Sequence, residues 1–191
     1  LRTEVLHDGA HSGSAGADQR ALRVDAFGVG TDGDLGAGAR LAGDGHNRHG
    51  SRNQFRNLTL EQAAEAVWGW CVGIDFTLGD QKLPSGATDF ARAKSFERAA
   101  PVSHVRPAYR CPMPAPADLW LYVNNQKRQG GCTSNLIVQP LETIVELSRF
   151  WELQPGDMIF TGTCGGADKV FPGDHLEGGV NGVGSIKVDI I

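Results

Sequence analysis

Hydrophobic and polar positions divide this chain of 191 residues into two parts with different patterns. Residues 1–54 contain eleven glycines and only nine residues of the Val, Ile, Leu, Met and Phe class, and no helical or strand period persists among them. From Asn57 onward, regular patterns follow one another at short intervals. We therefore expect residues 55–191 to form one folded domain, and residues 1–54 to be a Gly-rich, atypical or poorly ordered segment.

A second interpretation of residues 1–54 is a shifted reading frame relative to an ancestral coding sequence. Ala, Gly, Arg, Asp and His crowd this segment, and the regular pattern begins abruptly after it. Resequencing the gene and finding no nearby frame that encodes a strand would exclude that interpretation. The run Gly28–Gly33 matches G-x-G-x-x-G, but the helix that a dinucleotide site requires after it is absent from the pattern.

Two helices and a strand are indicated in the second part. Thr59 and Gln62 form a capping box, which predicts a short helix over Leu60–Ala66. Alternation over Val67–Phe76 places large apolar side chains on one face and predicts a strand. Pro140–Phe150 opens with proline and carries apolar residues at helical spacing, so it predicts an amphipathic helix.

Four further segments have strand patterns and are joined in pairs by Asn-Asn or Asn-Gly turns: Leu119–Val123 with Gln126–Gln129, and His175–Val180 with Ser185–Ile191. Pro155-Gly156-Asp157 is a turn signal, and it precedes a predicted strand over Met158–Thr161. Short strands, close turns and few helices together indicate an α+β fold that is rich in β-structure.

Composition narrows the class of protein. The net charge of −4 gives a nucleic-acid partner no support, and no stretch approaches the ~20 apolar residues that a membrane span requires. The first residues lack the basic and then apolar pattern of a signal peptide. Four widely spaced cysteines, Cys71, Cys111, Cys132 and Cys164, fit reduced thiols, so we expect a cytoplasmic protein.

Several separate motifs occur in the second part. They are Gly-Ile-Asp-Phe-Thr at Gly73–Thr77, Lys-Ser-Phe-Glu at Lys94–Glu97, the run from Lys127 to Leu136, and Thr-Gly-Thr at Thr161–Thr163. In this order they resemble the fumarylacetoacetate hydrolase family over residues 57–191, and within it fumarylpyruvate or acylpyruvate hydrolases. The resemblance implies a mixed β-sandwich roll, a homodimer and a divalent metal, Mg²⁺ or alternatively Mn²⁺ or Ca²⁺. It also implies hydrolysis of a carbon–carbon bond in a small β-diketo acid.

Asp75 is the candidate metal ligand. A carboxylate at the end of a strand suits Mg²⁺ or Ca²⁺, although such a residue also caps turns. The resemblance favours the metal, because the family's Asp-x-Thr-x-Arg-Asp pattern is matched here by Asp75 and Thr77. Thr77 is therefore a candidate substrate-binding residue. Gly79 and Lys82 stand where relatives have arginine and glutamine that help to hold the substrate.

Lys94 is the candidate catalytic residue, because the resemblance places its ammonium group near the metal and the substrate carboxylates. A cation there can stabilise a developing enolate. Gly162 and Thr163 are implied to bind the oxo-acid end of the substrate. Cys164 stands where relatives have proline, which should loosen the loop. It lacks a histidine partner, so we do not expect it to be a nucleophile.

Two features of the family are missing from the sequence. Relatives carry a Glu-x-Glu pair of metal ligands on a strand, and an N-terminal lid whose His and Glu activate water. Family spacing falls near Asp44 and His46, which have ligand side chains two residues apart but Gly-rich flanks. Three hypotheses stay open: an active or impaired hydrolase, an isomerase or oxaloacetate decarboxylase on the same scaffold, and an inactive family member.

Overall fold

The computed structural model describes residues 3–5, 22–29, 55–112, 116–154 and 156–191. The strands are β1 (Thr3–Val5), β2 (Leu22–Val29), β3 (Gly69–Trp70), β4 (Val72–Leu78), β5 (Arg106–Pro107), β6 (Asp118–Val123), β7 (Gln126–Cys132), β8 (Asp168–Val170), β9 (His175–Val180) and β10 (Gly184–Ile190). The helices are α1 (Leu60–Ala66), α2 (Phe90–Lys94) and α3 (Pro140–Phe150), with a 3-10 turn at Thr133–Asn135.

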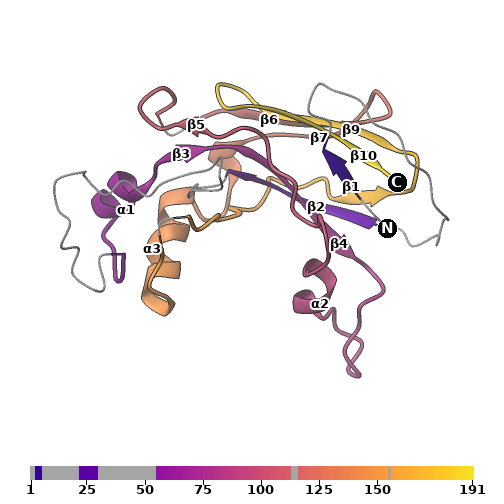
Figure 1. The fold of residues 1–191 in the computed structure, drawn as a ribbon, viewed down its shortest axis with the longest axis horizontal. Coiled ribbons are helices and arrows are strands. Elements are labelled where there is room, and N and C mark those ends of the chain that lie inside the picture. Colours follow the sequence, from indigo (N-terminus) through magenta and orange to yellow (C-terminus); the bar gives the residue numbers. More distant parts are fainter. Residues whose placement is uncertain (1–2, 6–21, 30–54, 113–115, 155) are drawn as a thin grey trace.

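Among the described residues, these strands form three sheets. The largest has the order β1-β10-β9-β6-β7, the second β4-β2-β8, and the third β3-β5. Every pairing is antiparallel. Figure 1 shows the five-stranded sheet lying across β4 and β2, with α1 and α3 together at one end of the molecule. The predicted α+β class, with several sheets and few helices, is confirmed.

Both predicted helices have the bounds that their capping signals gave. Thr59 and Gln62 form the reciprocal hydrogen bonds of a capping box at α1. Pro140 opens α3, and Gln139 pairs with Glu142 in the same way. The two helices are tied together where Ser148 Oγ accepts a hydrogen bond from the Leu58 backbone N–H at 2.9 Å.

The two predicted hairpins are also confirmed. Asn124 and Asn125 join β6 to β7 with φ angles of 50° and 63°, which asparagine tolerates better than most residues. β7 runs on to Cys132, three residues further than its pattern indicated. The second hairpin joins β9 to β10 through Asn181–Val183, where Gly182 has φ 81°.

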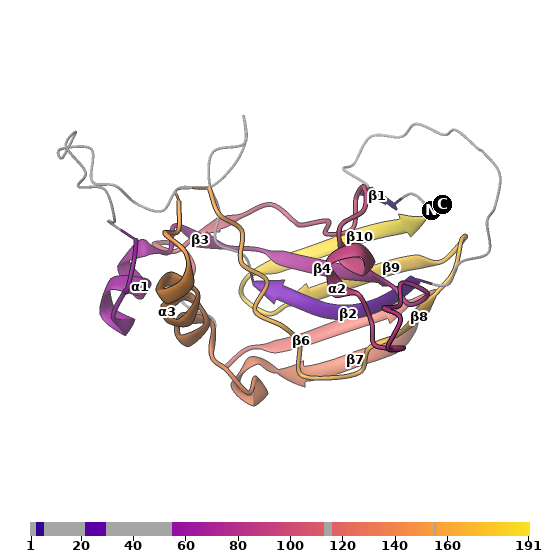
Figure 2. The same ribbon diagram turned by 90° about the horizontal axis from the view of Figure 1, so that it is seen from below.

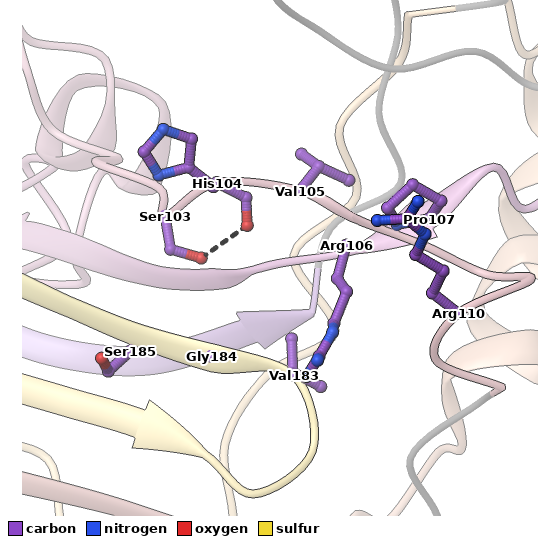
Figure 3. Close-up of a pocket in the computed structure, with 9 residues that line it drawn as sticks. All are labelled: Ser103, His104, Val105, Arg106, Pro107, Arg110, Val183, Gly184 and Ser185. Carbon is purple, nitrogen blue, oxygen red and sulfur yellow. Dashed lines mark hydrogen bonds between the residues drawn. The ribbon is translucent and has the colours of Figure 1, made fainter.

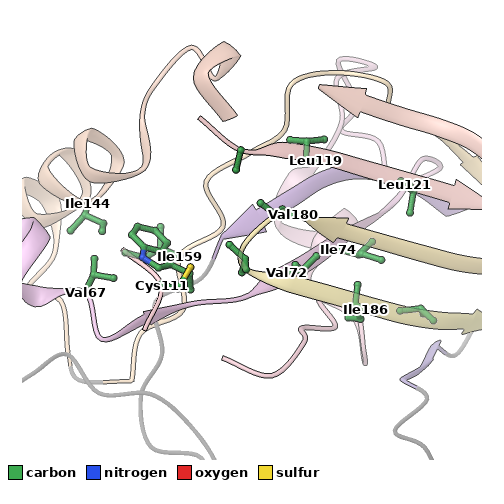
Figure 4. Packing of buried hydrophobic residues seen from close by; sticks show 14 of the residues in the cluster. Val67, Val72, Ile74, Cys111, Leu119, Leu121, Ile144, Ile159, Val180 and Ile186 are labelled. Carbon is green, nitrogen blue, oxygen red and sulfur yellow. The ribbon is translucent and has the colours of Figure 1, made fainter. Parts of the chain in front are cut away.

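The hydrophobic core fills the space between β4 and the five-stranded sheet. Val72, Ile74 and Phe76 on β4 are fully buried, as is Val188 on β10. Figure 4 shows apolar side chains from β4 and β10, among them Ile186, together with Leu119 and Leu121 of β6 and Val180 of β9. Period-2 alternation therefore supplies the core, with one face of each strand buried.

One strand prediction is confirmed in part, and another was wrong. The predicted strand Val67–Phe76 is interrupted at Cys71, because β3 pairs with β5 whereas β4 pairs with β2. The predicted strand Met158–Thr161 forms no β-ladder among the described residues. One edge of β4 is taken by β2. On the other edge, the Ile74 and Phe76 backbone N–H groups donate to the carbonyl oxygens of Pro101 and Ala99. Met158–Thr161 therefore lies on a face of β4, with Phe160 against Gly73.

Two strands, β1 and β2, fall within residues 1–54, where the pattern predicted no regular structure. β1 extends the large sheet beside β10, and β2 lies between β4 and β8. The register of β2 shifts between Val24 and Ala26. A bulge there moves the alternation by one residue, which is why no steady period is visible in the sequence. The remainder of the predicted segment lies outside the described residues.

Among the described residues, no helix combines the length and the apolar content that crossing a membrane requires.

Candidate active site

Asp75, Thr77 and Lys94 meet on one face of β4. The Lys94 ammonium group donates hydrogen bonds to Asp75 Oδ2 at 2.5 Å and to Thr77 Oγ1 at 2.9 Å. The Asp75 side chain is 19% exposed and that of Lys94 is 32% exposed, so the pair is partly open to solvent. The structure thus brings together three residues that the sequence singled out for chemistry.

Local structure explains how a residue nineteen positions downstream reaches Asp75. Asp75 and Thr77 are two apart on β4, so their side chains share a face. Asp89 caps α2 by accepting a hydrogen bond from the Arg92 N–H at 3.2 Å, and Lys94 is the last residue of this short helix. Figures 1 and 2 show α2 against β4, on the side away from the five-stranded sheet.

A third segment, Phe160–Gly166, closes this face. A Cβ atom on Gly73 would lie 2.6 Å from the Phe160 ring, so glycine is what lets the ring approach β4. β8 follows the segment and pairs with β2 beside the Leu78 end of β4. The intervening residues therefore pass the part of β4 that carries Asp75.

Within this segment, Gly162 adopts φ 84°, which favours glycine. The Thr163 hydroxyl is buried and has no hydrogen-bond partner among the described residues. An orphaned buried hydroxyl is costly unless a ligand or water satisfies it. The predicted oxo-acid residues thus lie on the loop that follows Phe160, and the Thr163 hydroxyl group is a donor with no assigned partner.

Cys164 is held as a structural thiol. Its Sγ donates a hydrogen bond to the Cys132 carbonyl oxygen at 2.8 Å. Burial, with a smaller effect from the neighbouring Cys132 thiol, raises the pKa of the Cys164 thiol above its ordinary value of 9.0. It is therefore protonated at neutral pH, which agrees with the expectation that it is not a nucleophile. All four cysteines are free.

The two departures that bear on substrate binding lie at the far end of β4. Gly79 is exposed, and a Cβ atom there would meet no other atom within 4 Å. The Lys82 ammonium group donates to Thr88 Oγ1 at 2.9 Å, closing the excursion that leads into α2. The Lys82 side chain is therefore hydrogen-bonded within the chain itself, to the Thr88 hydroxyl group.

A separate hollow of about 430 Å³ lies by the β9–β10 turn. Arg106 crosses it, and its Nη1 donates to the Gly182 carbonyl oxygen at 2.7 Å. Figure 3 shows the His104 ring and the Arg106 side chain on opposite sides of their segment, and the Arg110 side chain extending toward Pro107. The polar groups that line this hollow do not converge, so the Asp75 face of β4 is the better candidate site.

A family model for the C-terminal domain of fumarylacetoacetate hydrolases matches residues 51–191 of the chain. The chain belongs to the fumarylacetoacetate hydrolase family. The match begins six residues before Asn57, where the sequence pattern became recognisable, and it confirms the resemblance drawn from the motifs.

Two curated relatives in this family have different named activities. The mitochondrial oxaloacetate tautomerase of Bos taurus is 34% identical over 137 residues, which cover 71% of this chain and 62% of that protein. The fumarylpyruvate hydrolase of a Ralstonia species is 34% identical over 137 residues, covering 70% of each chain. The chain spans about three-fifths of the length of the first curated relatives.

A solved structure of the family gives the fold at higher coverage. The fumarylpyruvate hydrolase of Pseudomonas aeruginosa, crystallised with Mn²⁺ and pyruvate, superposes with a TM-score of 0.69 at 29% identity. The alignment covers 94% of this chain and 69% of that one. Its ligands are a divalent ion and an oxo acid, the two kinds that the motifs predicted.

The side chains that the structure describes do not complete a divalent-metal site. No group of three or more His, Cys, Asp or Glu residues suited to a metal occurs among them. Asp75 supplies a carboxylate oxygen of the kind that Mg²⁺ and Ca²⁺ prefer, but Oδ2 already accepts a hydrogen bond from the Lys94 ammonium group. Asp44 and His46, the candidates for the missing Glu-x-Glu pair, lie outside the described residues.

The backbone of β2 adds a residue that the sequence reasoning missed. Val24 is opposite Phe76 and Ala26 is opposite Asp75, so the extra residue of the bulge is Asp25. Asp25 is thereby next in register to the candidate ligand Asp75, on a neighbouring strand. The signal was present as a lone aspartate in the apolar run of β2, but only the pairing relates it to Asp75.

Proposed function

We propose that this chain forms the site-bearing part of a hydrolase that cleaves a carbon–carbon bond in acylpyruvate- or fumarylpyruvate-type β-diketo acids. The observation that carries the proposal is the Lys94 ammonium group, which donates hydrogen bonds to both Asp75 and Thr77. The named activity of the Ralstonia relative supports the same substrate class.

The groups of the site suit the charges of this reaction. Cleavage of a β-diketo acid releases an oxo acid as its enolate, which carries negative charge next to a carboxylate. The Lys94 cation can offset that charge in a partly buried setting. The unpartnered Thr163 hydroxyl can donate a hydrogen bond to the carboxylate, and Gly162 lets the backbone approach it. Substrate binding and enolate stabilisation are the roles that we assign.

We also propose that a divalent ion, Mg²⁺, Mn²⁺ or Ca²⁺, binds at Asp75, as the Mn²⁺ in the Pseudomonas relative suggests. Asp25 is the first candidate for a second ligand because of its register position. The ion would compete with Lys94 for the Asp75 oxygen. A calorimetric titration with Mn²⁺ tests the site: Asp75→Ala should abolish binding, and Asp25→Ala should weaken it. Unchanged binding in both variants would exclude this location.

The second candidate function is an isomerase, with an oxaloacetate decarboxylase as a related alternative. The Bos taurus relative is named as an oxaloacetate tautomerase, and keto–enol conversion requires enolate stabilisation but no attacking water. The cation at Asp75 and Thr77 serves that reaction equally well. A family member without catalytic activity is the third candidate, because the described side chains supply a single carboxylate ligand.

One set of assays separates these candidates. The full chain is incubated with Mn²⁺ and either acetylpyruvate, fumarylpyruvate or oxaloacetate, and loss of the enol absorbance is followed. Hydrolysis in ¹⁸O-water should place the label in the carboxylate of the acid released together with pyruvate, that is, acetate or fumarate. We expect a rate below the ordinary ~1–10³ s⁻¹ of enzymes. Conversion of oxaloacetate alone would favour the isomerase, and release of CO₂ the decarboxylase. No reaction with tight Mn²⁺ and pyruvate binding would indicate an inactive member.

The remaining features implied by the family are part of the same proposal. We propose that the sheets form the family's mixed β-sandwich roll, that the chain pairs with a second copy of itself, and that it acts in the cytoplasm on small oxo acids from aromatic catabolism. Sedimentation of the full chain tests the pairing: a dimer is expected, and a monomer at micromolar concentration would contradict it.

A further inference from the structure

Gln129 is a buried polar residue on a strand whose side chains are otherwise largely exposed. It is 2% exposed, whereas its neighbours Arg128 and Gly130 are both exposed. Its Oε1 is buried and has no hydrogen-bond partner among the described residues. An unsatisfied amide oxygen is unfavourable in the interior, and an apolar side chain of similar size would avoid it. Packing alone therefore does not account for an amide here.

The other half of the amide has a partner on the candidate oxo-acid loop. Gln129 Nε2 donates a hydrogen bond to the Gly165 carbonyl oxygen at 3.0 Å. The next residue, Gly166, passes directly over the same side chain, since a Cβ atom on it would lie 3.0 Å from Gln129 Cγ. The amide thus contacts the loop two and three residues after Thr163.

The loop has few conformational restraints of its own. Gly162, Gly165 and Gly166 all have φ between 84° and 108°. Glycine has more freedom to lose on ordering than any other residue, so such a loop requires anchors. The Cys164 thiol bond to the Cys132 carbonyl is one anchor on β7, and the Gln129 amide is the other.

We infer that Gln129 is a positioning residue, whose amide holds the loop Thr161–Gly166 on β7 and so fixes the Thr163 hydroxyl in the oxo-acid site. The inference rests on the proposed function in one respect, namely that Thr163 binds an oxo acid. Gln129 acts through the loop and does not touch the reacting atoms. Replacing the Gln129 amide should therefore cost more free energy of oxo-acid binding than free energy of unfolding.

Two substitutions test this inference on the full chain. Gln129→Met removes the donor at every pH. Gln129→Glu keeps the shape, but only its neutral carboxyl group can donate to Gly165. Burial should raise the pKa of that carboxyl group, so the hydrogen bond is present below this pKa and is lost as the pH rises through it. Ser148→Ala is the matched control, because Ser148 is also a fully buried polar residue but lies on α3.

The measurements are pyruvate binding by calorimetry with Mn²⁺ between pH 5.5 and 8.5, and hydrogen exchange of the loop amides. Gln129→Met should weaken pyruvate binding roughly tenfold at each pH, the effect of about one hydrogen bond. Gln129→Glu should match it at high pH and recover toward the parent at low pH. Both should speed exchange of residues 161–166 at neutral pH, and Ser148→Ala should change neither quantity.

The outcomes separate the inference from the proposed function. If the parent chain does not bind pyruvate, the proposed function fails, and the exchange of the loop amides alone decides the role of Gln129. If the parent binds pyruvate and Gln129→Met binds it equally well, the positioning role is wrong. Unchanged exchange of the loop amides in Gln129→Met overturns it as well.

Discussion

The two faces of β4 differ in almost every physical property although they belong to one strand. Val72, Ile74 and Phe76 are fully buried against the five-stranded sheet. Gly73 and Asp75 alternate with them on the opposite face, where Phe160 and Lys94 meet them. One face consists of apolar side chains in close packing, and the other holds a polar cluster that is partly open to solvent.

This difference suggests that one face of β4 contributes to the stability of the fold, whereas the other face carries the candidate site. The apolar face gains its free energy from burial, which depends little on the identity of the partner side chain. The polar face depends on specific partners that arrive from α2 and from the loop before β8. Substitutions on the first face should therefore act on stability, and those on the second should act on binding and turnover.

The largest expected effect is on the polar face. Asp75→Ala should abolish binding of Mn²⁺ and turnover, because it removes the carboxylate oxygen that faces Lys94. The free energy of unfolding should change by only about 1 kcal/mol, since the ion pair is partly exposed. Calorimetry and urea unfolding give the two quantities. Asp118→Ala, an exposed change on β6, is the control, and a parent-like Mn²⁺ affinity in Asp75→Ala would contradict the site.

The matching change on the apolar face is Phe76→Ala. It removes a ring that is fully buried, so the free energy of unfolding should fall by about 3–5 kcal/mol. The fraction that stays folded should bind Mn²⁺ with nearly the affinity of the parent. Urea unfolding, followed by titration below the transition, checks both statements. Lost affinity without lost stability would show that the two faces are not independent.

Lys94→Met should affect turnover and metal binding in opposite directions. Removing a cation that stabilises the enolate should lower turnover by about 10²–10³-fold. The affinity for Mn²⁺ should rise, because the ammonium group no longer competes for Asp75 Oδ2. Steady-state rates and calorimetry measure the two effects, with Lys187→Met, an exposed lysine on β10, as the control for loss of a positive charge. A weaker Mn²⁺ affinity in Lys94→Met would mean that Lys94 supports the metal site and does not compete with it.

The smallest effect is expected from Gly79→Arg, which supplies the arginine that the family's Asp-x-Thr-x-Arg-Asp pattern implies at this position. The position is open, so the side chain should fit without strain. A guanidinium group near the substrate carboxylates should lower the KM about three- to tenfold. Steady-state kinetics with acetylpyruvate test it, and Ser85→Arg controls for the added charge alone. Equal gains in both variants would show a general electrostatic effect.

The sequence was most informative where a signal lies within a few residues. The capping box of α1, the opening proline and apolar spacing of α3, the Asn124-Asn125 turn and the strand patterns of β6, β9 and β10 gave elements that the structure confirms. It failed where neighbours in space decide the outcome. Met158–Thr161 has the pattern of a strand but lies on the face of β4, whose two edges are already paired.

The candidate site shows the same division. Asp75, Lys94 and Thr163 were named from motifs, but the motifs could not show that Lys94 holds Asp75 and Thr77 at once. Asp25 and Gln129 were missed, because their relevance depends on the register of β2 and on the loop that crosses β7. Neither the strand register nor the contact between the loop and β7 produces a periodic pattern in the sequence.

The sequence by itself determined the family and the class of fold, and it proposed the residues of the candidate site, because these follow from local patterns and from motifs in a fixed order. Only the tertiary structure decided which faces of β4 and β7 carry the site and which groups satisfy one another. Contacts between residues far apart in the chain depend on strand register and on which edges are occupied, and no short segment encodes either of them.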